Sequence, residues 1–402
     1  MTIPDLHRAI VDRRTEFLDL LGELVRIETP TGDLAGAERF VVHLRAVLEG
    51  DAWAVETDER EGVGALLVAR MAGRTDSEST LLLAHYDTVH DVGTLERSPW
   101  RVEGDVAYGP GALDMKAGIA AAIVALRALH AVGGGPAGRV TLLVTSDEET
   151  GSHASRERIE REAGEHDRVL VLEPSRDDGA LKLGRKGVAD FHLTFEGRAA
   201  HAGLAPETGA SALVELARAA LTIADLGDAA AGTTVNPTVA RSGQATNVIP
   251  DHARLSVDVR LPTMVEAERV EGAIRGYVPH DPEIRVRIDG GVNRPPMEAT
   301  VGNRRLLARA QAIGATWGWS VESAVVGGGS DGNFTSALGV ATLDGVGAVG
   351  GGAHTLGEHV RVGETLDRVA LVANLLASDT GAVAGDDAHP PAAAVSDGAR
   401  QP

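Results

Sequence analysis

The chain has 402 residues, with 38 Lys and Arg against 58 Asp and Glu, so its formal net charge at pH 7 is −20. This acidity repels polyanions, and we expect neither nucleic acid nor a membrane surface as a partner. Because the chain contains no cysteine, disulfides, a thiol nucleophile and a thiolate metal site are excluded.

Acids and bases are scattered among Leu and Val at helical spacing in the first 24 residues, which lack the basic-then-apolar layout of a secretory signal. The longest apolar run, residues 117–132, is interrupted by Arg127 and His130 and is shorter than the ~20 residues that a spanning helix needs. We therefore expect a cytoplasmic protein without a membrane segment.

Strand-like apolar runs alternate with helical stretches through the first half of the chain. This alternation predicts an α/β fold, a mostly parallel sheet with helices on both faces, whose chemistry lies at the C-terminal ends of the strands. The predicted strands are 65–71, 81–84, 140–145 and 169–172, and the predicted helix is 116–132.

From about Gly184 apolar and polar residues alternate instead, as in half-buried antiparallel strands. Strands near 188–195 and 253–260 and helices over 209–224 and 265–277 fit an inserted ferredoxin-like α+β domain of β-α-β-β-α-β order. The pattern of the first half of the chain then returns, with predicted helices over 301–318 and 366–376. We predict a catalytic metal domain at 1–184 and 295–377, an inserted domain at 185–294 and a disordered tail at 378–402.

Polar side chains follow several of the predicted strands. His85 and Asp87 are two residues apart, so the Asp87 carboxylate could bond one imidazole nitrogen and leave the other for a metal. The acids Asp147, Glu148 and Glu149 repel one another unless a cation lies nearby, and Glu173 follows four apolar residues. A solvated strand end or acidic loop is the alternative.

Two further candidates follow glycine-rich turns. Asp114 comes after Gly109-Pro110-Gly111 and just before the long apolar helix, where an aspartate is also a common N-cap. His354 follows Gly350-Gly351-Gly352, and a single histidine in such a place is more often structural.

Together the two histidines and one carboxylate from each of three places, Asp114, the acids at 147–149 and Glu173, suit two divalent ions, with zinc favoured and cobalt or manganese as possible substitutes. The chemistry expected is activation of a water between metals ~3.5–4 Å apart, which lowers its pKa to ~7, with one further carboxylate to carry its proton.

From residue 16 to residue 376 the chain resembles the dinuclear-zinc peptidases and amidohydrolases. This family includes glutamate carboxypeptidase, acetylornithine deacetylase, succinyl-diaminopimelate desuccinylase and aminoacylase. The motifs that carry the resemblance are His-x-Asp at 85–87, Asp-Met-Lys at 114–116, Asp-Glu-Glu-x-Gly-Ser at 147–152, Glu-Pro at 173–174, Gly-Arg-Ala-Ala-His-Ala-Gly at 197–203 and Gly-Gly-Ala-His at 351–354.

The resemblance implies a role for each motif residue. Asp114 would bridge both metals, with His85 and Glu173 on one ion and Glu149 and His354 on the other. Glu148 would be the general base, and Asp87 would orient His85.

Outside the metal motifs, the resemblance implies that His201 of the inserted domain reaches the partner's site in a homodimer and there stabilises the developing oxyanion. Asn247, Arg260 and Arg294 would grip a substrate carboxylate, although Asn247 could simply shape a turn and Arg260 could pair with a neighbouring acid.

Two segments are most similar to the glutamate carboxypeptidase branch: Ser330-Asp331-Gly332 after Gly327-Gly328-Gly329, and the Gly184-Arg185-Lys186-Gly187 turn. We therefore expect a zinc-dependent hydrolase that cleaves the amide bond of a small N-acyl or peptidyl amino acid with a free C-terminal carboxylate. The alternatives are an N-acyl-amino-acid deacylase and, more remotely, a catalytically silent metal-binding dimer.

Overall fold

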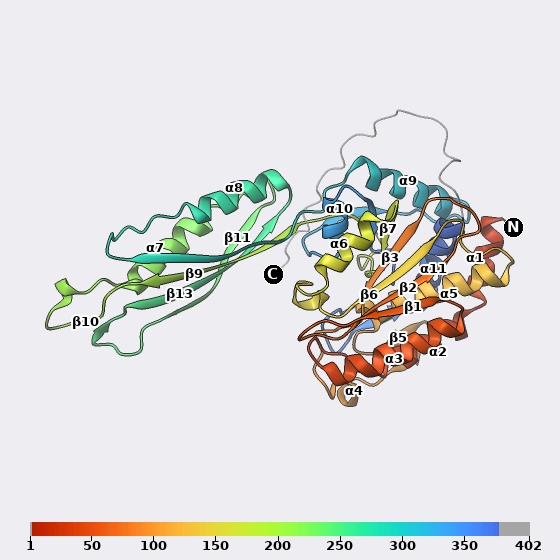
Figure 1. The fold of residues 1–402 in the computed structure, drawn as a ribbon, viewed down its shortest axis with the longest axis horizontal. Helices are drawn as coiled ribbons and strands as arrows, with labels where there is room; N and C mark the ends of the chain where they lie inside the picture. The colour runs from red at the N-terminus through yellow and green to blue at the C-terminus, as the bar shows by residue number, and fades with distance from the viewer. Residues whose placement is uncertain (1, 378–402) are drawn as a thin grey trace.

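The structure is a computed structural model that describes residues 2–377, so the tail predicted at 378–402 lies outside the described residues. Figure 1 shows two units side by side, a large one with a wide sheet and a smaller one that extends away from it. The predicted domain limits stay a prediction, although strands of the smaller sheet begin at Gly187 and end at Arg294.

An eight-stranded sheet forms the centre of the large unit, in the order β1-β2-β6-β3-β7-β16-β8-β15. Its middle strands β6, β3 and β7 run parallel, whereas β1 and β2 add antiparallel pairs at one edge. The strands are β1 Ala54–Asp58, β2 Leu66–Met71, β3 Thr80–His85, β6 Val140–Thr145, β7 Arg168–Val171, β8 Leu181–Arg185, β15 Ser323–Val326 and β16 Ala341–Asp344.

Helices cover both faces of this sheet, because its strands are apolar on both sides. Leu82 and Ala84 of β3 face one apolar cluster, and Leu81 and Leu83 face another. Residues of α6 and α10 join the second cluster, and the other long helices of this unit join the first. The helices are α1 Ile3–Val11, α2 Arg14–Val25, α3 Leu34–Gly50, α4 Thr94–Arg97, α5 Ala117–Ala131, α6 Arg156–Gly164, α9 Val301–Ala315, α10 Gly332–Ala337 and α11 Val362–Ala377.

The smaller unit is an antiparallel sheet in the order β11-β13-β9-β14, with α7 and α8 on one face. If the four strands are numbered by their order in the chain, they lie in the sheet in the order 2-3-1-4. This is the ferredoxin-like arrangement expected from β-α-β-β-α-β. Its own apolar cluster includes Phe191, Leu193 and Phe195 of β9. The elements are β9 Gly187–Glu196, α7 Ala212–Ala224, β11 Thr234–Ser242, β13 His252–Leu261, α8 Met264–Arg275 and β14 Arg285–Arg294.

Two short sheets complete the structure. One pairs β10 with β12 at the far tip of the smaller unit (Figure 1), and the other belongs to the large unit, in the order β17-β18-β5-β4. Their bounds are β4 Arg101–Glu103, β5 Val106–Tyr108, β10 Ala200–His201, β12 Val248–Ile249, β17 Gly350–Gly351 and β18 His359–Arg361.

The predicted fold class is confirmed, including the mostly parallel central sheet and the additional ferredoxin-like sheet. Within residues 2–377, no helix has the length and apolar character required to cross a bilayer.

Candidate active site

Three neighbouring parallel strands bring the predicted acids and one histidine together. His85 is the last residue of β3, Glu148 and Glu149 follow β6, and Glu173 lies just beyond β7. Because β6, β3 and β7 are adjacent and parallel, their C-terminal ends meet at one edge of the sheet.

Asp114 enters this edge from an irregular π-helical turn, Ala112–Lys116, ahead of α5. The peptide bond between Asp114 and Met115 is cis. The two oxygens of the Asp114 carboxylate face different partners: Oδ1 lies 3.2 Å from His85 Nε2, and Oδ2 lies 3.3 Å from His354 Nε2. The carboxylate therefore stands between two groups of donors.

Each group has a further carboxylate. Glu173 Oε1 lies 3.5 Å from His85 Nε2, and Glu149 Oε2 lies 3.4 Å from His354 Nε2. The two histidines differ in exposure: the side chain of His85 is 2% exposed, and that of His354 is 51% exposed. His354 sits in a loop where its own φ is 64°.

Asp87 connects the first histidine with the adjacent acids Glu148 and Glu149. Its Oδ1 and Oδ2 accept the backbone N–H groups of Glu148 and Glu149, each at 3.2 Å. The same carboxylate lies 3.3 Å from His85 Nδ1, which also faces the Asp87 backbone carbonyl at 3.0 Å. These contacts leave His85 Nε2 directed at Asp114 and Glu173.

Glu148 lies against the first donor group without being paired with a histidine. One of its carboxylate oxygens lies within 4.8 Å of ligand atoms of His85 and Glu173. Arg294 Nη2 donates to its Oε1 at 3.0 Å. Burial raises the pKa of Glu148 well above its ordinary value, and the charge of Arg294 opposes that shift.

Arg294 is itself held in a buried network. Its Nη1 lies 2.7 Å from Asp331 Oδ1, and its Nη2 donates to Ser152 Oγ at 3.0 Å. The predicted substrate arginine therefore contacts the candidate base directly, and sequence reasoning did not foresee this contact or the buried position of Asp331.

Glu173 has a second set of buried partners. Arg185 Nη2 donates to its Oε2 at 3.2 Å, and Arg185 is also bound by both oxygens of Asp344. Lys182 Nζ lies 4.0 Å from the same Glu173 oxygen. These contacts occupy Oε2 and leave Oε1 directed toward His85.

Glu358 is a buried carboxylate that sequence reasoning missed. It accepts backbone N–H groups from Gly111 at 3.0 Å, Leu113 at 2.7 Å and Asp114 at 3.0 Å. His90 Nε2 lies 2.7 Å from its Oε2. Glu358 thus holds the backbone that carries Asp114. In the sequence, Glu358 is simply an acid in a polar loop, and such an acid is usually interpreted as solvated.

The donor set fits a pair of divalent ions. Glu149 Oε1 is buried without a hydrogen-bond partner, as expected for an oxygen that ligates a cation. Hydrogen bonds to Asp114 and then to Glu149 raise the pKa of His354 to about 10. Burial would lower the pKa of His85, yet its bonds to Asp114, Asp87 and Glu173 raise it well above the ordinary value. The site is thus rich in negative charge, and its N and O ligands suit zinc.

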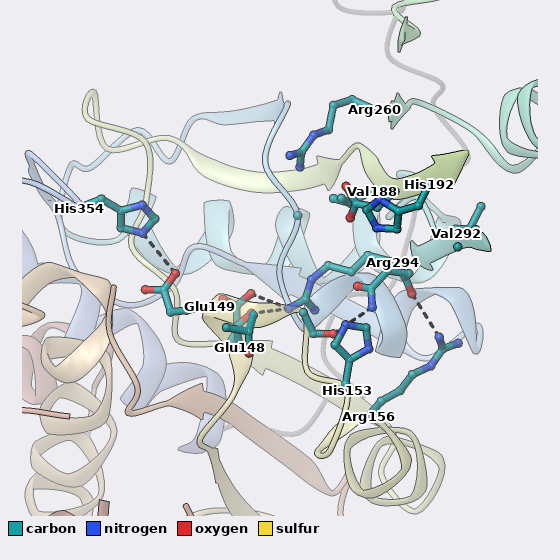
Figure 2. A pocket seen from close by; sticks show the side chains of 17 residues that line it. Glu148, Glu149, His153, Arg156, Val188, His192, Arg260, Val292, Arg294 and His354 are labelled. Atoms are coloured by element: carbon teal, nitrogen blue, oxygen red, sulfur yellow. Dashed lines mark hydrogen bonds and ion pairs between the residues drawn. The ribbon is translucent and has the colours of Figure 1, made fainter. Parts of the chain in front are cut away.

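Glu148, Glu149 and His354 line a cleft of about 820 Å³ between the two units, and they also line a smaller hollow of about 340 Å³ together with Asp114 and Glu173. Figure 2 shows Glu148, Glu149 and His354 on one side, and Arg260 and His192, from the smaller sheet, on the other. Arg260 makes two bonds to the carboxylate of Asp258, at 2.7 and 3.1 Å. It nevertheless lines the cleft, so it remains a candidate for a substrate carboxylate.

His201 and Asn247 are not brought to this cleft. Both are exposed at the β10–β12 tip, where the Ala202 N–H donates to the Asn247 carbonyl at 2.9 Å. Figure 1 shows β10 at the end of the smaller unit that is remote from the large one.

The sequence profile of peptidase family M20/M25/M40 matches residues 81–378. The chain belongs to this family. It is 35% identical over 381 residues to carboxypeptidase G2 of Pseudomonas sp. (strain RS-16), covering 92% of this chain and 91% of that protein. It is 32% identical over 283 residues to succinyl-diaminopimelate desuccinylase of Alkalilimnicola ehrlichii, covering 67% of this chain and 74% of that protein.

Among solved structures, this M20 chain is similar to aminopeptidase PepT from Bacillus cereus ATCC 10987. The TM-score is 0.72 at 22% identity, with 90% of this chain and 98% of that chain covered, which supports the fold. The family and the cluster of ligands identify the chain as a metal-dependent hydrolase of amide bonds. The predicted family resemblance is thereby confirmed, and the catalytically silent alternative is disfavoured.

Proposed function

We propose that this M20 enzyme is a two-zinc exopeptidase that releases a C-terminal amino acid from an N-acyl or peptidyl group. The observation that carries the proposal is the Asp114 carboxylate, whose oxygens lie 3.2 Å from His85 and 3.3 Å from His354. A single carboxylate between two His–carboxylate groups is the arrangement that a shared pair of ions requires. The similarity to carboxypeptidase G2 over 92% of the chain supports the exopeptidase assignment.

His85 and Glu173 would hold one ion, Glu149 and His354 the other, and Asp114 both. Such a pair would lower the pKa of the attacking water and polarise the scissile carbonyl. Cobalt or manganese could replace zinc, because the ligands are imidazole and carboxylate groups.

Glu148 would carry the proton of the attacking water to the leaving group. Its Oε1 is taken by Arg294, so its other oxygen is the group available to accept a proton from the attacking water. As the bond between water oxygen and carbonyl carbon forms and the C–N bond breaks, Glu148 would pass that proton to the leaving amine nitrogen. Asp87 fixes the backbone that carries this carboxylate by accepting the Glu148 N–H.

The free carboxylate of the substrate would be bound by Arg260, Arg294 and Asn247. Support for Arg260 comes from its position on the cleft wall opposite Glu148 (Figure 2). Arginine suits this task because its donors match a carboxylate in pairs.

We further propose a homodimer in which the tip of one smaller unit completes the site of its partner. His201 would donate to the developing oxyanion there, and Asn247 would contact the substrate. The support is that both side chains are exposed, share one tip through the Ala202–Asn247 bond, and lie away from the cleft of their own chain.

An N-acyl-amino-acid deacylase is the second candidate, favoured by the 32% identity to succinyl-diaminopimelate desuccinylase. Both reactions cut an amide next to a free carboxylate. They differ in whether the enzyme recognises mainly the C-terminal amino acid or the acyl group. A comparison of substrates therefore separates them.

The test is hydrolysis of matched acyl-glutamates, dipeptides and succinylated amino acids by zinc-loaded and chelator-treated enzyme. We expect turnover only with metal, and the highest kcat/KM for substrates with a C-terminal glutamate-like residue. A preference for the succinylated compounds would favour the deacylase. Loaded enzyme that is inert toward all three classes would overturn the proposal.

A further inference from the structure

Three arginines lie in one row across the open face of the smaller sheet. In the strand register Arg241 of β11 is opposite Arg254 of β13, and Arg254 and Arg287 are both opposite Thr194 of β9. Helices α7 and α8 pack on the other face, so nothing in residues 2–377 covers this one. We call Arg241, Arg254 and Arg287 the arginine row.

The charge of the arginine row is only partly neutralised. Arg287 makes one exposed ion pair with Asp289 at 3.2 Å. Arg241 and Arg254 make no ion pair with any residue of the described chain, although they face each other on adjacent strands. Like charges directly opposite on a sheet are destabilising. In a chain of net charge −20, this arrangement indicates that an anionic group binds here.

A hollow at the arginine row shares one lining residue with the active-site cleft. The row and His192 line a cavity of about 430 Å³, and His192 also lines the active-site cleft. Figure 2 shows His192 and Arg260 on the wall of the cleft that the smaller sheet provides. From Arg260 to Arg254 along β13 the separation is roughly 20 Å, at about 3.4 Å per residue.

We propose that the open face is a subsite for the acidic part of an extended substrate, an acidic peptide of about six residues whose C-terminal end lies in the cleft. This inference rests on the proposed exopeptidase function and adds a substrate class to it. Carboxylates of the peptide would bind Arg241 and Arg254, which have free guanidinium donors suited to paired hydrogen bonds. An exposed site of this kind adds a few-fold in affinity for each charge.

The test compares two acetylated peptides of about six residues that end in the same C-terminal Ala-Glu. In one peptide the preceding residues are glutamates, and in the other they are glutamines. Initial release of the C-terminal glutamate gives kcat/KM for each. We expect the zinc-loaded wild type to prefer the glutamate peptide by about five- to tenfold, an effect that added salt weakens. The double variant R241Q/R254Q should lose this preference and hydrolyse the glutamine peptide as the wild type does.

The control is R305Q, which removes one positive charge from an exposed position of α9 outside the smaller sheet. Equal kcat/KM for the two peptides in the wild type would overturn the subsite, and so would a preference that survives in R241Q/R254Q or disappears in R305Q. A change in sedimentation coefficient confined to R241Q/R254Q would also overturn it, because the face would then be an interface between copies.

Failure of the proposed function gives a different result. If neither peptide is hydrolysed, fluorescence anisotropy of the labelled glutamate peptide still measures binding. Binding to the wild type that is lost in R241Q/R254Q would support the subsite while the exopeptidase proposal falls. Absent or equal binding would overturn the subsite itself.

Discussion

Glu148 and Glu149 are adjacent in one loop but have different surroundings. We therefore expect different results when the charge of each is removed. Glu149 Oε2 faces His354 and its Oε1 has no hydrogen-bond partner, whereas Glu148 is bonded by Arg294. We expect E148Q to retain its metal and lose turnover by ~10²-fold or more, because only the proton carrier is removed. Metal analysis and kcat at saturating zinc measure the two quantities.

E149Q is the matched control at the neighbouring position. It removes one carboxylate from the group around His354, so we expect lower metal content along with low activity. Unchanged turnover in E148Q would remove Glu148 from the mechanism. Equal metal loss in both variants would mean that Glu148 is a ligand.

The residues proposed as ligands could be picked out in the sequence because several of them adjoin an element with a strong local pattern. His85 and Glu173 end apolar runs, and Asp114 precedes a long apolar helix. Asp87 could be predicted beside His85, but the supporting acids Glu358 and Asp344 could not, because their partners are remote in the sequence. Glu358 binds a backbone that lies 244 to 247 residues earlier in the chain. Asp344 binds Arg185 over a separation of 159 residues.

At the scale of elements, Glu358 holds the turn that carries Asp114 between the two donor groups. Glutamine at this position would present an amide N–H to backbone donors, so E358Q should lose about 1–3 kcal/mol of stability. Because the displaced Asp114 contacts both donor groups, zinc occupancy should fall at both sites. Thermal unfolding and metal analysis measure these effects. E364Q, which alters an exposed acid of α11, is the control, and equal behaviour of the two variants would contradict the positioning role.

A second carboxylate ties elements of the smaller unit together. Glu215 of α7 accepts the Tyr277 hydroxyl at 2.6 Å and the backbone N–H of His280 at 2.8 Å, just after α8. Burial alone would raise the pKa of Glu215, but these hydrogen bonds lower it below its ordinary value. The stabilisation is therefore fully present above the unfolded-state pKa near ~4.3 and is lost as pH falls through the lower folded-state pKa.

E215Q should accordingly be less stable than the wild type by about 1–3 kcal/mol at neutral pH. Their difference should shrink as the pH falls below ~4. Denaturant unfolding of the metal-free proteins, followed by circular dichroism, gives this difference at each pH. A difference that stays constant to pH ~3 would show that the charge of Glu215 does not contribute.

The regular elements follow their local patterns more closely than the short ones. The predicted helix over 116–132 is α5 at Ala117–Ala131, and the predicted strand over 140–145 is β6. Strand β8 was missed, because Lys182 and Arg185 interrupt its apolar pattern and are neutralised only by remote acids. Periodicity also carries no information on the direction in which the smaller sheet extends, since this depends on how β9 and β14 leave the large unit.

At the scale of the whole molecule, the remote tip predicts a site shared between two chains. H201A should lower turnover by ~10²-fold or more, the usual cost of one oxyanion donor. If His201 acts in the partner's site, coexpressed H201A and E148Q chains should recover activity, because the H201A chain keeps Glu148 and receives His201 from its partner. Random pairing makes about half of the dimers mixed, each with one complete site, so about a quarter of wild-type activity should return. Recovery near zero in dimers verified by sedimentation would mean that His201 serves its own chain or none. The structure favours recovery, since His201 lies at the end of the smaller unit away from the cleft.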